Sequence, residues 1–174
     1  MNQSKAIIVV ENREALRAAA GSARISTQQG TAMEIFDRST GDEKDLNLLG
    51  KVLSSGHKSV IEHQTVTVAF NDVSVLVEQF VIECRLASFT VKSRRYVDFG
   101  EAGWVCPEGL TDDQKALYDS TMAARFEDYK RLMDLGVPKE DARFVLPYCL
   151  RSNFFMTSTL PPTIYSLVMT FSYP

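Results

Sequence analysis

The chain has 174 residues, of which 45% are hydrophobic and 24% are charged, and its formal net charge is −3. This length suits one soluble domain with a substantial core, and the acidic balance excludes a global field that attracts nucleic acid, so any anion site must be local. The three cysteines are odd in number and fit no zinc spacing, which predicts neither a disulfide framework nor a metal site. The N-terminal apolar run soon meets charge, so we expect no signal peptide, no membrane span and a reducing, cytoplasmic location.

The hydrophobic pattern predicts strands and helices in mixed order. In chain order they are a strand at 6–10, helices at 12–23 and 43–53, a strand at 65–70, a helix from Asp72 to Cys84, a helix at 111–135, a helical turn from Pro138, a strand at 154–159 and a last helix from Pro161. Thr111 and Gln114 have capping-box spacing before the longest helix. Because no regular β-α-β alternation is present, we predict an α+β fold.

The first group of candidate site residues is the segment ECRLASFTVKSRRY at 83–96. It gathers four cations beside three hydroxyls: Arg85, Lys92, Arg94 and Arg95 with Ser88, Thr90 and Ser93. A guanidinium fork with a neighbouring hydroxyl is a good oxyanion site. The alternative is a solvated basic surface that balances an acidic helix.

Two further segments are candidates. GHKSVIEHQ at 56–64 holds both histidines of the chain with Glu62 between them, but it lacks the i, i+4 histidine spacing and a third ligand, so we predict no metal there. A polar loop before a strand is the plainer interpretation. ARFVLPYCLRSNFFMT at 142–157 contains Arg143 and Arg151 within an apolar stretch, and core packing explains its other large residues.

Together, the three segments resemble the flavin-dependent thymidylate synthases, also called thymidylate synthase complementing proteins. The family hallmark R-H-R-x-x-S-x-N-x-x-S-x-R is matched by Arg85, Ser88, Ser93 and Arg95. Residues 56–63 are similar to the family's G-H-x-S/T-x-x-E-H, and the segment from 142 is similar to its A-R-x-x-L-P followed by F-F-x-T. The resemblance covers about residues 15 to 160, and three motifs in register are far more specific than one.

The resemblance implies a single domain over residues 1–174 with a central, mostly antiparallel sheet flanked by long helices. It implies a homotetramer that binds FAD between subunits, reduces it with NADPH, and methylates dUMP to dTMP with methylenetetrahydrofolate. By position, Ser93, Arg95 and Arg143 would bind dUMP. The residues expected to border FAD are His57, Ser59, Glu62 and Arg85. No residue is assigned a catalytic role.

The sequence also departs from the family pattern. Glu83-Cys84 replaces the first Arg-His pair, and a carboxylate in place of a cation reverses the local electrostatics beside an anionic cofactor. Thr90 replaces the hallmark Asn, the expected last helix carries no arginine, and the chain is short at its C-terminus relative to the family. Cys84 on an apolar helix side reads as an inert thiol rather than a nucleophile. The alternative function is therefore a non-catalytic paralogue that keeps the scaffold and a nucleotide pocket, as a regulatory or partner subunit.

Overall fold

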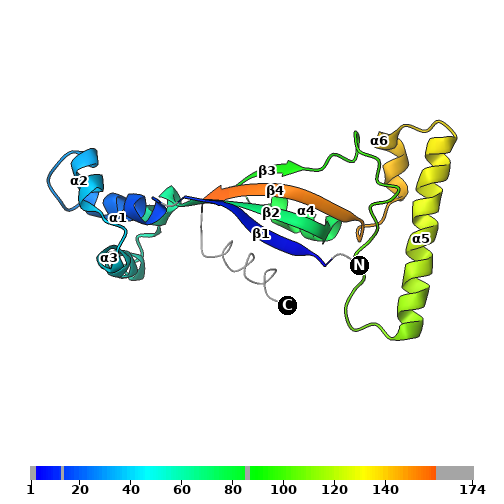
Figure 1. Cartoon of the computed structure of the whole chain (residues 1–174), viewed down its shortest axis with the longest axis horizontal. Coiled ribbons are helices and arrows are strands. Elements are labelled where there is room, and N and C mark those ends of the chain that lie inside the picture. The colour runs from blue at the N-terminus through cyan, green and yellow to red at the C-terminus, as the bar shows by residue number, and fades with distance from the viewer. Residues whose placement is uncertain (1–2, 13, 85–86, 160–174) are drawn as a thin grey trace. The chain divides into compact units, whose positions relative to one another are not determined.

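Residues 3–12, 14–84 and 87–159 are described by the computed structural model (Figure 1). They form strands, α-helices and two 3-10 turns, η1 and η2. In chain order the elements are β1 (Lys5–Glu11), α1 (Ala15–Ile25), α2 (Ala32–Arg38), α3 (Glu43–Ser54), η1 (Lys58–His63), β2 (Thr65–Ser74), α4 (Val75–Ile82), β3 (Ala87–Val91), α5 (Asp112–Asp134), α6 (Lys139–Ala142), η2 (Arg143–Val145) and β4 (Arg151–Thr159).

The strands form one sheet in the order β1-β2-β4-β3. On β2 and β4, the rings of Phe70 and Phe154 stack with centroids 4.5 Å apart, and the backbone N of Asp72 donates to Oδ1 of Asn153 at 2.9 Å. Residue numbers rise along β2 as they fall along β4, so the two strands are antiparallel. The predicted α+β fold with a mostly antiparallel sheet is therefore confirmed.

The described residues divide into two compact units, each described here by itself. One unit, named the α5 unit, contains 3–7, 69–84 and 89–156, and the other, named the α1 unit, contains 8–12, 14–68, 87–88 and 157–159. All four strands contribute residues to both units. The single domain expected over residues 1–174 stays a prediction.

Helices α1, α2 and α3 and turn η1 make up most of the α1 unit. The core shared by α1, α3 and η1 consists of Ala19, Ala23, Leu49 and Val60. Helix α1 faces α2 at Gly21, where a Cβ would lie at an ordinary van der Waals distance of 3.6 Å from the Cα of Phe36. The sequence pattern missed α2, although Thr31 and Glu34 form a capping box at its start, the same device that predicted α5.

Helix α5 begins as predicted, with Thr111 as N-cap and Gln114 completing the capping box. Gly136, at φ +86°, follows the end of the helix, where a residue with a Cβ would be strained. The core of the α5 unit consists of Val75, Phe99, Phe126 and Leu150. The long amphipathic helix and its boundaries were therefore readable from the sequence.

The predicted start of α4 is wrong. Asp72 does not cap the helix: it lies within β2 at φ +54°, and Ser74 is the N-cap, with its Oγ accepting from the backbone N of Val77 at 3.2 Å. The strand continues past Phe70 to Ser74, and Val73 is buried there. Its register is shifted by one residue from the alternating Val66, Val68 and Phe70, on the far side of Asp72. Leu76 and Phe80, expected on the apolar side of α4, are 50% and 67% exposed. The helix expected from Pro161 lies outside the described residues.

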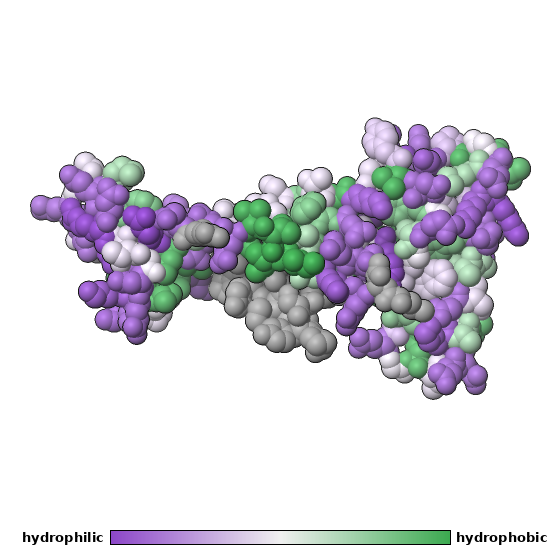
Figure 2. Space-filling view, viewed as in Figure 1, coloured by the Kyte–Doolittle hydropathy of each residue, from purple (hydrophilic) through white to green (hydrophobic). Residues whose placement is uncertain are grey.

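Strand β1 is at one edge of the sheet and carries exposed apolar side chains. Figure 2 shows hydrophobic atoms gathered over this strand, and the exposed residues there are Ile7, Ile8, Val9 and Val10. An apolar edge strand of this kind offers unpaired backbone groups as well as apolar surface. Among the described helices, none has the length and apolarity needed to cross a membrane.

Candidate functional site

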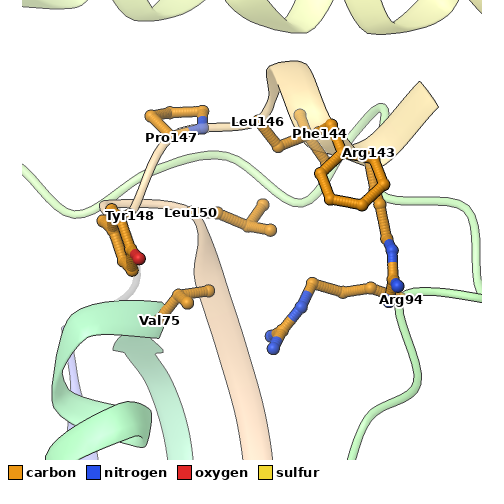
Figure 3. Close-up of a pocket in the computed structure, with 8 residues that line it drawn as sticks. All are labelled: Val75, Arg94, Arg143, Phe144, Leu146, Pro147, Tyr148 and Leu150. Carbon is orange, nitrogen blue, oxygen red and sulfur yellow. The ribbon is translucent and has the colours of Figure 1, made fainter. Parts of the chain in front are cut away.

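A pocket with a cavity volume of about 330 Å³ lies in the α5 unit (Figure 3). It is lined by Val75, Arg94, Arg143, Phe144, Leu146, Pro147, Tyr148 and Leu150. The lining thus combines two guanidinium groups with aromatic and aliphatic side chains. In Figure 3 the two arginines lie on one side and Tyr148 on the other.

The pocket is assembled from the start of α4, the turn after β3, and the segment from η2 to the start of β4. Backbone bonds hold these pieces together, because the N of Val75 donates to the O of Leu150 at 3.0 Å and the N of Leu76 donates to the O of Tyr148 at 3.1 Å. Leu150 is 1% exposed and anchors the floor in the core of this unit. Backbone hydrogen bonds therefore tie the turn that carries Tyr148 and Leu150 to the start of α4.

Arg94 is fixed by a buried carboxylate. Its Nη1 and Nη2 donate to Oε2 and Oε1 of Glu78 at 2.9 and 2.8 Å, a bidentate pair. The Oγ of Ser152, on β4, also donates to Oε2 of Glu78. The hydrogen bonds that Arg94 donates to Glu78 raise the pKa of Arg94 above its ordinary value, and burial opposes that rise. Arg94 therefore keeps one orientation and its charge is matched.

Arg143 has a different environment. Its Nε donates to the backbone O of Glu140 at 2.9 Å, and its guanidinium lies 5.6 Å from the centroid of the Phe144 ring. Within the described part of the chain, its guanidinium forms no ion pair with a carboxylate. Arg143 thus gives the pocket a positive charge that those residues leave uncompensated.

Of the residues predicted to bind dUMP, the pocket lining includes Arg143 but neither Ser93 nor Arg95. Arg95 is exposed, and its backbone N donates to the Oγ of Ser93 at 3.3 Å. The structure therefore brings Arg143 together with Arg94, and the roles given to Ser93 and Arg95 stay predictions. Sequence reasoning counted Arg94 among the four cations of the basic segment without assigning it a ligand, and it gave Phe144 and Tyr148 no role in a site. Glu78 was an available signal, because a lone carboxylate within the apolar run VLVEQFVI needs a cationic partner when buried.

Three of the four residues predicted to border FAD lie in the α1 unit. His57 is the N-cap residue of η1, and Ser59 and Glu62 lie on that turn. All three are exposed, and their side chains have no hydrogen-bond partner among the described residues. They offer a hydroxyl, an imidazole and a carboxylate for a polar cofactor, which suits FAD in donor and acceptor chemistry. Arg85 lies outside the described residues, so the FAD assignment stays a prediction.

No group of three or more His, Cys, Asp or Glu residues that could hold a metal ion occurs within the described residues. The three cysteines, Cys84, Cys106 and Cys149, are unpaired with one another and half-buried. Cys149 contacts the sulfur of Met122 at 3.1 Å. The lining of the pocket offers guanidinium groups for binding an anion, next to apolar and aromatic walls.

Solved structures of other proteins share the fold of this chain. The chain is similar to the crystal structure of thymidylate synthase X from Helicobacter pylori with FAD and dUMP, with a TM-score of 0.70, 16% identity, and coverage of 98% of this chain and 93% of that one. It is also similar to the UMP/dUMP methylase PolB from Streptomyces cacaoi bound with 5-Br dUMP, with a TM-score of 0.72, 24% identity, and coverage of 91% and 74%. Because both identities are below 25%, these similarities establish the fold of the chain and nothing further.

The family model for the thymidylate synthase complementing protein, Thy1, matches residues 8–162, and the chain belongs to this family. It is 36% identical over 113 residues to a flavin-dependent thymidylate synthase of Geobacter sulfurreducens, covering 63% of this chain and 49% of the relative. It is 33% identical over 159 residues to the enzyme of that name from Halobacterium salinarum, covering 75% and 64%. The chain thus spans between about half and two thirds of the length of these curated relatives. The resemblance seen in the three sequence motifs is confirmed.

Proposed function

We propose that this chain binds dUMP in the pocket of the α5 unit and takes part in its flavin-dependent methylation to dTMP. The observation that carries the proposal is the pairing of a held guanidinium, Arg94, with an uncompensated one, Arg143, beside apolar and aromatic walls. A nucleoside monophosphate presents a phosphate dianion and a planar base, and this lining offers a complementary partner to each. Membership of the family and the dUMP-bound structures of similar fold support the same substrate.

In this proposal the residues divide their work. Arg143 attracts the phosphate, Arg94 orients it, and Phe144 and Tyr148 pack against the base or sugar and exclude water. His57, Ser59 and Glu62 would hold FAD, which supplies the hydride once NADPH has reduced it, while methylenetetrahydrofolate supplies the carbon. The family motif predicts Ser93 and Arg95 as further dUMP ligands, but neither residue lines this pocket, so neither is given a role in it.

We further propose that the chain works as a homo-oligomer, a tetramer by family resemblance. The exposed apolar side chains of α4, Leu76 and Phe80, and those of β1 support this arrangement, because surfaces of this kind are usually covered in an assembly. Light scattering at micromolar concentration tests it directly. A monomer at that concentration contradicts the proposal and removes any site that needs a second subunit.

A non-catalytic paralogue is the second candidate function. Glu83 is exposed and follows the last residue of α4, so its carboxylate lies at the negative end of that helix. The family places an arginine at this position. A chain with this reversal would keep the dUMP pocket and bind FAD weakly, and it would serve a partner subunit or a regulatory role.

Three measurements on the purified chain test the proposal. Calorimetry with dUMP should give saturable binding that Arg143→Ala weakens and that the control Arg131→Ala, on the exposed side of α5, leaves unchanged. A visible absorption spectrum reports bound flavin, and tritium release from labelled dUMP with FAD, NADPH and methylenetetrahydrofolate reports turnover. Binding with flavin and turnover supports the enzyme, binding without either supports the paralogue, and no dUMP binding overturns both.

A further inference from the structure

We propose that Arg94 contacts the phosphate of the bound nucleotide and that Glu78 positions the Arg94 side chain. Arg94 occupies the unspecified position x of the S-x-R part of the family hallmark. This inference rests on the proposed dUMP binding, and it names which side chains of the pocket perform it. It departs from the motif, which points to Arg95.

The first support is the burial of Glu78. Its side chain is 2% exposed, and an ionised carboxylate at that depth is strongly unfavourable unless cations and donors surround it. Arg94 supplies two hydrogen bonds and Ser152, itself 0% exposed, supplies another. Replacing this network with apolar side chains of similar volume would stabilise many cores, so its presence beside a pocket suggests a functional reason.

The second support is the geometry of the guanidinium. A guanidinium has five N–H donors in one plane, and Glu78 uses one on each terminal nitrogen of Arg94. The Arg94 side chain is 20% exposed and lines the pocket, so its remaining donors are available at that surface (Figure 3). Because Glu78 fixes the plane of the fork and Ser152 fixes the carboxylate, the free edge of Arg94 is held ready for an anion rather than ordered when the ligand arrives.

The third support is the charge balance. Glu78 cancels the charge of Arg94, whereas Arg143 is not paired with a carboxylate among the described residues. The pocket therefore has one net positive charge with two guanidinium groups. Arg143 attracts a dianion from solution, and Arg94 donates directional hydrogen bonds to it. Because Glu78 cancels the charge of Arg94, the two guanidinium groups can lie in one pocket without strong mutual repulsion.

Arg95 lacks each of these features. It is exposed, it is not part of the pocket lining, and within the described residues its guanidinium forms no ion pair. The adjacent arginines thus differ in tertiary environment although the sequence presents them as equivalent neighbours.

Conservative arginine-to-lysine changes test the role of Arg94. Calorimetry with dUMP is run on the full chain and on Arg94→Lys, Arg95→Lys and the surface control Arg131→Lys, with the melting temperature of each recorded. Lysine keeps the charge and a partner for Glu78 but loses the planar fork, so we expect Arg94→Lys to raise the Kd about tenfold or more. Arg95→Lys and Arg131→Lys should stay close to the unsubstituted chain.

A double-mutant cycle tests the role of Glu78. Glu78→Gln should weaken dUMP binding when Arg94 is present and have no further effect in an Arg94→Ala background, because it acts through that side chain. Chemical rescue distinguishes a role in binding from a purely structural role. Guanidinium chloride at low millimolar concentration should restore dUMP binding to the Arg94→Ala variant, while the same concentration of sodium chloride should not. The rescue should disappear in Arg94→Ala with Glu78→Gln.

The outcomes separate this inference from the proposed function. If the unsubstituted chain binds dUMP and Arg94→Lys behaves like Arg131→Lys, the role of Arg94 is overturned and dUMP binding stands. If Glu78→Gln acts equally with and without Arg94, or guanidinium fails to rescue, the positioning role is overturned. If the unsubstituted chain does not bind dUMP, the proposed function itself fails and this inference falls with it.

Discussion

Asp45→Ala should destabilise the α1 unit far more than a typical surface change, because Asp45 belongs to a buried ion pair. Its Oδ1 accepts from Nη2 of Arg24 at 2.5 Å, and its Oδ2 accepts from the backbone N of Gly41 at 2.8 Å. Arg24 also donates from Nη1 to Oγ of Ser39 at 2.6 Å. This network links α1, the end of α2 and the start of α3.

The expected magnitude follows from burial. Asp45 is 1% exposed and the Arg24 side chain is 15% exposed, so removing the carboxylate leaves a largely buried cation with one remaining partner at Ser39. Breaking a buried pair in this way lowers the free energy of unfolding by about 3–5 kcal/mol. Because Arg24 keeps some exposure to solvent, we expect a loss of ~3 kcal/mol for Asp45→Ala. Asp45→Asn keeps an acceptor for Gly41 and should cost about half as much, in the range of one charged hydrogen bond, ~1.5 kcal/mol.

Urea unfolding combined with amide hydrogen exchange measures this effect, because exchange reports whether the loss is confined to α1, α2 and α3. Glu14→Ala is the matched control: it removes the exposed partner of Arg17, 2.6 Å away and 57% exposed, and should cost no more than about 1 kcal/mol. A cost for Asp45→Ala within that same range would refute the reasoning, since it would mean that Arg24 finds solvent or another acceptor at no penalty.

Three other predictions concern the site and its surroundings. Arg143→Ala should weaken dUMP binding by the contribution of a charge-assisted bond, about 1.5–3 kcal/mol or roughly ten- to a hundredfold in Kd, and calorimetry that returns an unchanged Kd contradicts the pocket assignment. Glu83→Arg should tighten FAD several-fold in a fluorescence titration, since it replaces repulsion of the pyrophosphate by attraction, and an unchanged Kd means that Glu83 points away from the cofactor. Lys115 and Trp104, which both donate to Asp119, hold the pKa of Asp119 below its ordinary value of 3.8. The stabilisation from Asp119 is therefore present above pH 3.8 and lost as the pH falls through the lower folded-state pKa, so the fluorescence of the single tryptophan should change below pH 3.8, and Asp119→Asn should remove that change.

The sequence could predict elements whose signals are local. The capping box at Thr111 and the glycine at Gly136 bracket α5 because caps and stops act within a few residues. The start of α4 was missed because Asp72 and Ser74 are both good cap residues, and the choice depends on how far β2 pairs with its neighbour. Turn η1 and strand β3 were not predicted as elements, since η1 is a short turn and β3 is a short strand whose pairing is long-range.

The sequence by itself determined the α+β class, the family, and Arg143 as a site candidate, since composition, periodicity and motif order are properties of the linear chain. Only the tertiary structure decided which arginine of the basic segment faces the pocket. Arg94 and Arg95 are adjacent and chemically identical, but Glu78 lies 16 residues before Arg94 in the chain and reaches it only after α4 has folded against β4. A buried carboxylate pairs with the cation that the fold places within hydrogen-bond distance. That placement depends on contacts between residues far apart in the sequence, and no local sequence pattern encodes it.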